Sequence, residues 1–197
     1  SGEYDVVVLT EKIGLQDSIK YHDSWYYVAR WAEKAWAANP DTRVHVYETW
    51  HGTDAEDGWL NRIDSDLPLL WEKEIIDRAL ADVDDARPIY VIPAGQAMAR
   101  FIRRAQARGG VGGISSEQDL LPDGIHMNHA ANYLVALTHY AVIYGRSPID
   151  LPHDGLVTDT GAPFEAPDAE TARLMQESVW EIVTSYKRSG VVGNASQ

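Results

Sequence analysis

The residues best suited to chemistry in this sequence are Asp123 and His126, which lie three positions apart in the segment LLPDGIHMN (120–128). At this spacing a carboxylate can hydrogen-bond one ring nitrogen of the imidazole and leave the other nitrogen free as a general base. The structural alternative is an aspartate that caps the following helix beside a packed histidine. The spacing therefore predicts an acid and base pair, and it raises the question of which side chain is the nucleophile.

Composition limits the partners that this chain can have. Lys and Arg number 17 against 30 Asp and Glu, and the formal net charge of -13 repels nucleic acid and anionic bilayers. No stretch approaches the ~18 uninterrupted apolar residues of a membrane span, and no export signal is present, so we expect a soluble chain without a membrane span. The absence of cysteine excludes disulfides, thiolate metal sites and cysteine nucleophiles. We expect a small neutral or hydrophobic substrate, no nucleic-acid partner and no cofactor.

Alternating strands and helices define the expected fold. Short runs rich in Val, Ile and Tyr predict strands at 4–10, 42–49 and 87–95. Apolar residues at helical spacing predict crossover helices over about 25–36 and 75–83. Strands that are apolar throughout and alternate with helices are typical of a parallel sheet covered on both faces. We therefore predict one α/β domain over all 197 residues, a three-layer sandwich with three parallel strands.

The C-terminal part is predicted to be helical, with one long interruption. Helices are expected over about 128–144 and about 167–186, where apolar residues again recur at helical spacing. Between them, residues 145–168 include four prolines and three glycines, which predicts a long loop. It is not a domain linker, because too little chain follows it to build a second core.

The residues that follow each predicted strand are the next candidates for function. Ligands of open parallel sheets bind beyond the carboxyl ends of the strands, where the loops of successive strands meet. A tryptophan that follows a strand is also a candidate for lining an acyl or sugar subsite. The substrate-binding or oxyanion candidates are Thr10, Glu11, Trp50, His51, Gly95 and Gln96.

At these residues the chain resembles the SGNH (GDSL-like) hydrolases, a family of esterases and lipases. The segment DGIHMN, followed by HAANYLVALTHYAVIYG, is similar to the family's last motif, D-x-x-H at the head of a C-terminal helix. The strands predicted at 4–10, 42–49 and 87–95 resemble the family's third, fourth and fifth strands. The resemblance covers nearly the whole chain, as the C-terminal two thirds of the family's domain.

This resemblance implies a fold and an activity. The family has a three-layer, flavodoxin-like α/β fold with a five-stranded parallel sheet. Asp123 and His126 would be the acid and base of a Ser-His-Asp triad that hydrolyses an ester, such as a small ester or an acylated sugar. The family's variety of substrates means that the resemblance does not specify the acyl or alcohol group.

The sequence departs from the family where the nucleophile is expected. No G-D-S-like segment is present, and Ser24 lies within a helical pattern without a preceding strand. Ser115 and Ser116 are predicted to lie in a loop and at the N-cap of a short helix. We therefore expect the nucleophilic serine to lie outside this chain.

The family's G-x-N-D motif is also absent, and LTEKIG (9–14) takes its place. Glu11 would stand where an oxyanion-binding asparagine is expected. An ionised carboxylate cannot donate a hydrogen bond, so Thr10 or backbone amides would have to serve instead.

The first predicted strand indicates that a further strand belongs beside it. The residues DVVVL (5–9) are apolar on both faces, as in a central strand, yet the chain offers a partner on one side only. An open edge of this kind favours aggregation. The opening SGEYD also provides little lead-in before the strand. We therefore expect a shortened domain completed by an N-terminal fragment, or a homodimer paired through Asp5 to Leu9.

Two other functions remain open from the sequence. The first is a non-catalytic domain of the same fold that binds carbohydrate or a protein partner in the cleft at the strand ends. The second and more distant one is a metal-dependent hydrolase, although the candidate ligands lack the tight spacing of known metal motifs. Those candidate ligands are Glu11, Glu48, His51 and Asp54.

Overall fold

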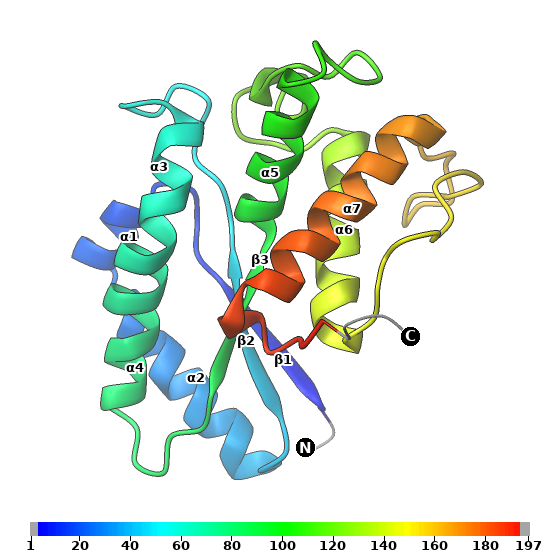
Figure 1. Ribbon diagram of the computed structural model, residues 1–197. Coiled ribbons are helices and arrows are strands. Elements are labelled where there is room, and N and C mark those ends of the chain that lie inside the picture. The colour runs from blue at the N-terminus through cyan, green and yellow to red at the C-terminus, as the bar shows by residue number, and fades with distance from the viewer. Residues whose placement is uncertain (1–3, 194–197) are drawn as a thin grey trace.

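Three parallel strands form one sheet in the computed structural model, which describes residues 4–193. The sheet has the order β1 (Val6–Thr10), β2 (Arg43–Glu48), β3 (Ile89–Pro93), with the register pairing Val6 with Arg43. Helices lie on both sides of the sheet (Figure 1). The predicted fold class, an α/β three-layer arrangement around a parallel sheet, is confirmed.

One side of the sheet is covered by four helical segments that precede β3 in the chain. They are α1 (Leu15–Tyr21), α2 (Ser24–Ala38), the π-helix η1 (Leu67–Asp77) and α4 (Arg78–Ala81). Val28 and Ala32 of α2 pack against Trp71 and Ile75 of η1 in one buried cluster with the sheet. The helix predicted over 25–36 is confirmed. The one predicted over 75–83 is the end of a longer helical segment, and its wide π turns have no signature in the apolar spacing.

The other side is covered by three helices that follow β3, namely α5 (Ala94–Gln106), α6 (His129–Tyr144) and α7 (Ala169–Ser185). The short α3 (Trp59–Asp66) packs against the same apolar cluster through Trp59 and Ile63. Both predicted C-terminal helices are confirmed. The segment between them is a long loop without helix or strand, as predicted, with one isolated bridge between Val157 and Pro163. Two 3-10 turns, η2 (Glu117–Asp119) and η3 (Lys187–Ser189), complete the described elements.

Helix α5 was not predicted, because it follows β3 without an intervening loop. The strand expected at 87–95 ends at Pro93, and Gly95 already lies in the first helical turn. A side chain at Gly95 would overlap the carbonyl oxygen of Thr49, so the turn passes too close to β2's end for any larger residue. Apolar residues then fill the core side of the helix, including Met98, Phe101 and Ile102, each fully buried.

Strand β1 is an edge strand within the described residues, as predicted. It pairs with β2 alone, and Val8 keeps 38% of its surface exposed. Arg43 N–H donates to the Asp5 carbonyl at 2.9 Å, so Asp5 and every second residue after it direct their backbone groups toward β2. Because backbone groups alternate in direction along a strand, the backbone N–H and C=O groups of Val6, Val8 and Thr10 point toward the open edge. Residues 1–3 of the opening segment lie outside the described range.

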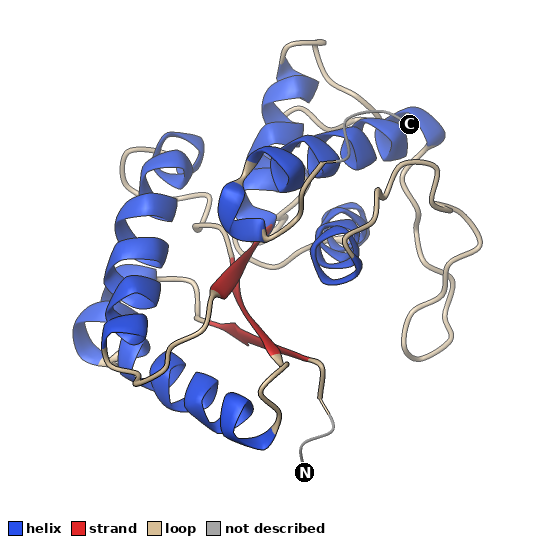
Figure 2. Cartoon of the chain, turned by 60° about the horizontal axis from the view of Figure 1, so that its bottom comes forward, coloured by secondary structure: helices blue, strands red, loops and turns tan. Residues whose placement is uncertain are grey.

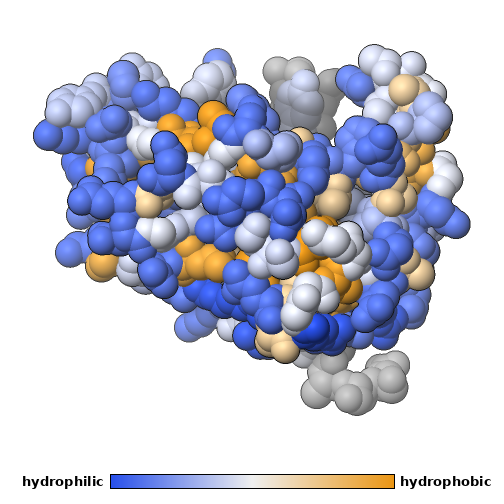
Figure 3. Space-filling model, turned by 90° about the horizontal axis from the view of Figure 1, so that it is seen from above, coloured by the Kyte–Doolittle hydropathy of each residue, from blue (hydrophilic) through white to orange (hydrophobic). Residues whose placement is uncertain are grey.

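Across residues 4–193, none of the helices combines the length and the apolarity needed to cross a bilayer. Figure 2 shows the strands between the two groups of helices, with the long loop extending to the side. The strands run so that their carboxyl ends lie at the upper end of Figure 1. Figure 3 looks down on that end, where a mostly hydrophilic surface includes several hydrophobic patches.

Candidate acid and base pair

Asp123 and His126 are paired in the loop between η2 and α6. Asp123 Oδ2 lies 2.7 Å from His126 Nδ1. The other carboxylate oxygen, Oδ1, accepts the backbone N–H groups of His126 at 2.7 Å and Ile125 at 3.1 Å. One carboxylate therefore closes the turn with one oxygen and orients the imidazole with the other.

The hydrogen bonds to Asp123 also determine its charge. Donation from the His126 backbone, from its side chain and from the Ile125 backbone lowers the pKa of Asp123 to about 2. An ionised Asp123 accepts a hydrogen bond from Nδ1–H, and the neutral imidazole tautomer that makes this contact leaves Nε2 unprotonated. The His126 side chain is 79% exposed, and no described residue hydrogen-bonds to Nε2. The pair thus has the arrangement of a general base that is open to a reactant.

Trp50, predicted to line a subsite, instead anchors this loop. Its ring is buried, and Nε1 donates to the Ile125 carbonyl at 2.9 Å. Nearby, Thr53 N–H donates to the Gly124 carbonyl at 2.9 Å. The segment after β2 therefore holds the turn that carries His126, and the pair is positioned by the carboxyl end of the sheet.

The C-terminal side of the loop is held by Asn128. Its Oδ1 accepts the Ala131 N–H and caps α6, while its Nδ2 donates to the Asp119 carbonyl at 2.7 Å. The alternative role for Asp123, as the cap of the following helix, is therefore wrong. Asp123 is free to serve His126 because a different residue satisfies the helix terminus.

The two candidates that follow β3 are engaged inside the protein. Gln96 donates its backbone N–H and its Nε2 to the Glu48 carboxylate, each at 3.1 Å. Glu48 is fully buried at the end of β2, and this burial raises its pKa to about 8. Gly95 is buried and lies against the same carboxyl group. Gly95 and Gln96 therefore form a structural junction between β2 and α5.

The remaining candidates lie on separate parts of the same edge. The Thr10 hydroxyl, at the end of β1, donates to the Tyr47 carbonyl at 3.2 Å, and the partly buried Glu11 follows it. His51 Nε2 lies 3.0 Å from Asp66 Oδ2 without hydrogen-bond alignment, and burial lowers its pKa. Asp66 lies at the end of α3, so this buried contact depends on how α3 packs beside the segment after β2.

The four metal-ligand candidates do not converge. Glu48 is bonded to Gln96, and His51 is turned toward Asp66. In residues 4–193 no group of three or more His, Asp or Glu side chains is arranged to hold a metal ion.

No described serine is placed as a nucleophile beside His126, since none hydrogen-bonds to its ring. Ser24 is the first residue of α2 and is 2% exposed. Ser115 and Ser116 both donate to the Asp119 carboxylate, and Ser116 caps η2 in a capping box, as predicted. Residues 1–3 and 194–197 lie outside the described range.

Replacing Trp50 with phenylalanine should loosen the loop that carries the pair. The change removes the donor to the Ile125 carbonyl and leaves most of the apolar contact, so we expect a loss of about 1 kcal/mol in unfolding free energy. Urea unfolding measures this loss, and amide exchange at Gly124 and Ile125 should become faster. Unchanged exchange there would contradict the anchoring role. Trp31→Phe, at an exposed ring on α2, is the matched control.

Comparisons with known proteins add no relative to these observations, since no family model, curated protein or solved structure matches this chain.

Proposed function

We propose that this protein supplies the acid and base of an SGNH-like serine ester hydrolase. The observation that carries the proposal is the 2.7 Å contact between Asp123 Oδ2 and His126 Nδ1, with Nε2 left open to solvent. His126 Nε2 would take the proton of a serine hydroxyl as its oxygen attacks an ester carbonyl. Asp123 would stabilise the imidazolium, which then returns the proton to the leaving alcohol. Water would release the acyl group from the serine by the reverse sequence of proton transfers.

The nucleophile in this proposal comes from a strand that pairs with the open edge of β1. Val6, Val8 and Thr10 turn backbone donors and acceptors toward that edge, which is the requirement for adding a strand. A strand added in parallel would end at the same edge of the sheet as Thr10, the edge to which the His126 loop is anchored. The proposed source of the serine is an added N-terminal fragment. A second copy of the chain could cover the same edge, but it has no G-D-S-like segment and would not supply the nucleophile.

Stabilisation of the developing oxyanion is assigned to donors at the end of β1. The backbone amides beside Thr10 are the proposed donors, and the Thr10 hydroxyl could join them only by leaving the Tyr47 carbonyl to which it donates. A small ester or an acylated sugar is the proposed substrate class.

Fluorophosphonate labelling with intact-mass analysis tests this proposal, because the reagent adds covalently to an activated serine. We expect a label on a second polypeptide, or on a longer chain, that carries the added strand, and no label on the 197-residue chain alone. The His126→Ala protein assembled in the same way should remain unlabelled. An unlabelled assembly without ester hydrolysis would overturn the catalytic proposal.

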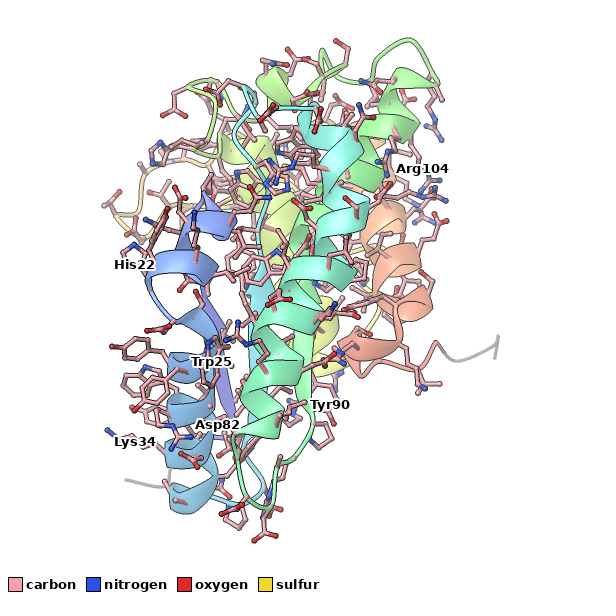
Figure 4. The ribbon with its side chains drawn as sticks, turned by 90° about the vertical axis from the view of Figure 1, so that its left-hand side faces the viewer. His22, Trp25, Lys34, Asp82, Tyr90 and Arg104 are labelled. Carbon is pink, nitrogen blue, oxygen red and sulfur yellow. The ribbon has the colours of Figure 1, made fainter. Side chains whose placement is uncertain are left out.

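A binding domain without turnover is the second candidate, and it is favoured by exposed aromatic rings on α1 and α2. Tyr21, Tyr27 and Trp31 are each more than half exposed, and the Lys34 ammonium lies 5.2 Å from the centre of the Trp31 ring. Figure 4 shows Lys34 on this side of α2. Exposed rings of this kind stack on sugars. Retention of an acylated glycan without hydrolysis would support this binding function. Loss of ester hydrolysis on addition of a chelator would instead indicate a metal-dependent hydrolase.

A further inference from the structure

One histidine side chain anchors the end of the long loop between α6 and α7. The backbone N–H of Glu165 donates to His129 Nδ1 at 2.8 Å. The His129 ring also stacks on Phe164, with the ring centres 4.6 Å apart and the ring planes inclined by 14°. Because His129 is the first residue of α6, these contacts join the loop to the start of that helix.

Residues 156–164 of the loop form a short hairpin, the 156–164 hairpin. Val157 and Pro163 are paired in an antiparallel bridge, and Phe164 N–H donates to the Leu156 carbonyl at 3.0 Å. These contacts lie within the hairpin itself. Figures 1 and 2 show the loop extending to one side of α6 and α7. The hairpin therefore moves as a unit unless a contact outside it holds it in place.

A single hydrogen bond provides most of that external contact. In the part of the chain that the structure describes, no hydrogen bond other than that of Glu165 joins residues 153–167 to the rest of the protein. Leu156 and Phe164 add partly buried apolar contacts with the main core. Loss of the bond to His129 would leave the hairpin held by these apolar contacts alone.

The acceptor in this hydrogen bond is a titratable nitrogen. Nδ1 can accept from Glu165 only in the neutral imidazole that carries its proton on Nε2, because both ring nitrogens of an imidazolium are donors. Protonation of His129 would therefore set two N–H groups against each other. The released form binds this proton better than the anchored form does, so a fall in pH favours release.

The charged groups that face His129 from the surrounding elements are all acidic. His129 lines a cavity of ≈ 390 Å³ together with Asp119 of η2, Glu165 of the loop and Asp168 at the N-cap of α7. Backbone hydrogen bonds lower the pKa of both Asp119 and Asp168, so these carboxylates stay ionised at the pH where imidazoles titrate. No lysine or arginine is among the lining residues. An imidazolium can donate to these carboxylates, which draws the ring away from the Glu165 backbone.

We propose that His129 is a pH-dependent anchor of the 156–164 hairpin. The neutral imidazole holds the hairpin against the start of α6, and protonation of the ring releases it. This inference does not depend on ester hydrolysis, because none of its residues belongs to the Asp123 and His126 pair.

A spin label on the hairpin tests the proposal by measuring its mobility. The sequence contains no cysteine, so Ala162→Cys, at an exposed position of the hairpin, provides a single labelling site in the full chain. We expect an ordered spectrum at about pH 8. At about pH 5.5 the mobile fraction should be about tenfold larger, which is the effect of losing one hydrogen bond. A spectrum that is the same at both pH values would overturn the proposal.

Two replacements of His129 separate its role as an acceptor from its titration. Asparagine places a carbonyl oxygen close to the position of Nδ1 and accepts at every pH, so His129→Asn should keep the hairpin ordered at both pH values. His129→Phe keeps a stacking ring without an acceptor, so its hairpin should be mobile at both. A pH response that persists in His129→Asn would assign the response to another group. An ordered hairpin in His129→Phe would show that the hydrogen bond is not the anchor.

The matched control is His153→Asn, which removes the other histidine of the same loop, outside the hairpin. This variant should keep the wild-type pH response. Circular dichroism of each labelled protein should show the same helix content at both pH values, which separates release of the hairpin from unfolding. A loss of helix in parallel with the mobility of the label would contradict local release.

Discussion

Replacing His126 with alanine is expected to lower the rate of ester hydrolysis by the assembled enzyme by about 10⁴-fold or more. Under the proposed mechanism, no other described group can take the serine proton, since His126 is the imidazole that Asp123 orients. The fold should be little changed, because the imidazole is exposed and the loop is held by Trp50 and Asn128. Initial rates on an aryl acetate and thermal melting would measure the two effects.

The control for this variant is His22→Ala, which removes another exposed histidine that lies outside the loop, after α1. Figure 4 shows its position. His22→Ala should keep both activity and melting temperature. Full activity in His126→Ala would end the interpretation of Asp123 and His126 as a catalytic pair.

Replacing Asp123 with asparagine should also lower the rate of ester hydrolysis, and the pH–rate profile of the wild-type enzyme tests the role of the carboxylate. The amide can still accept the backbone N–H groups but cannot stabilise an imidazolium, so we expect a loss of roughly 10³–10⁴ in rate. Because hydrogen bonds hold the pKa of Asp123 near 2, the wild-type carboxylate stays ionised down to acidic pH. Its protonation should therefore add no limb to the pH–rate profile between about pH 4 and 9. A limb in that range that disappears in Asp123→Asn would contradict the assignment.

The wild-type protein is expected to lose unfolding free energy as the pH becomes alkaline, because the buried Glu48 ionises. Glu48→Gln cannot ionise there, so it should lack this part of the decrease. Burial raises the pKa of Glu48 from 4.5 to about 8 in the folded state. Between these values the folded protein binds more protons at this group than the unfolded chain does, so this group makes stability fall as pH rises. Below pH 4.5 the carboxyl is neutral in both states, and its contribution no longer changes with pH. The full loss, reached above about pH 8, is on the order of a few kcal/mol.

Unfolding in urea at pH 5 and pH 9 measures this effect. The wild-type unfolding free energy should drop between the two values by more than that of Glu48→Gln. Glu74→Gln, at an exposed carboxylate paired with Arg78, is the matched control and should behave like the wild type. Equal drops in wild type and Glu48→Gln would show that the carboxyl ionises freely in the folded protein.

The sequence by itself determined the features that depend on local spacing. The alternation of apolar strands and helices predicts the three parallel strands and the layers on both sides. The three-residue spacing of Asp123 and His126 predicts their pairing, because one turn of backbone brings the two side chains together. The proline and glycine content of 145–168 predicts its long loop.

Tertiary structure alone decided which of these local features meet. Trp50 and Ile125 are distant in sequence, and their contact turns a predicted subsite residue into an anchor for the loop. Glu48 and Gln96 likewise pair only because β2 ends beside the first turn of α5, which also buries the carboxyl and raises its pKa. Contacts of this kind depend on the packing of separate elements, whose partners no local pattern specifies. The alternation and spacing of residues act within one turn or strand, whereas burial and charge depend on everything packed around a group.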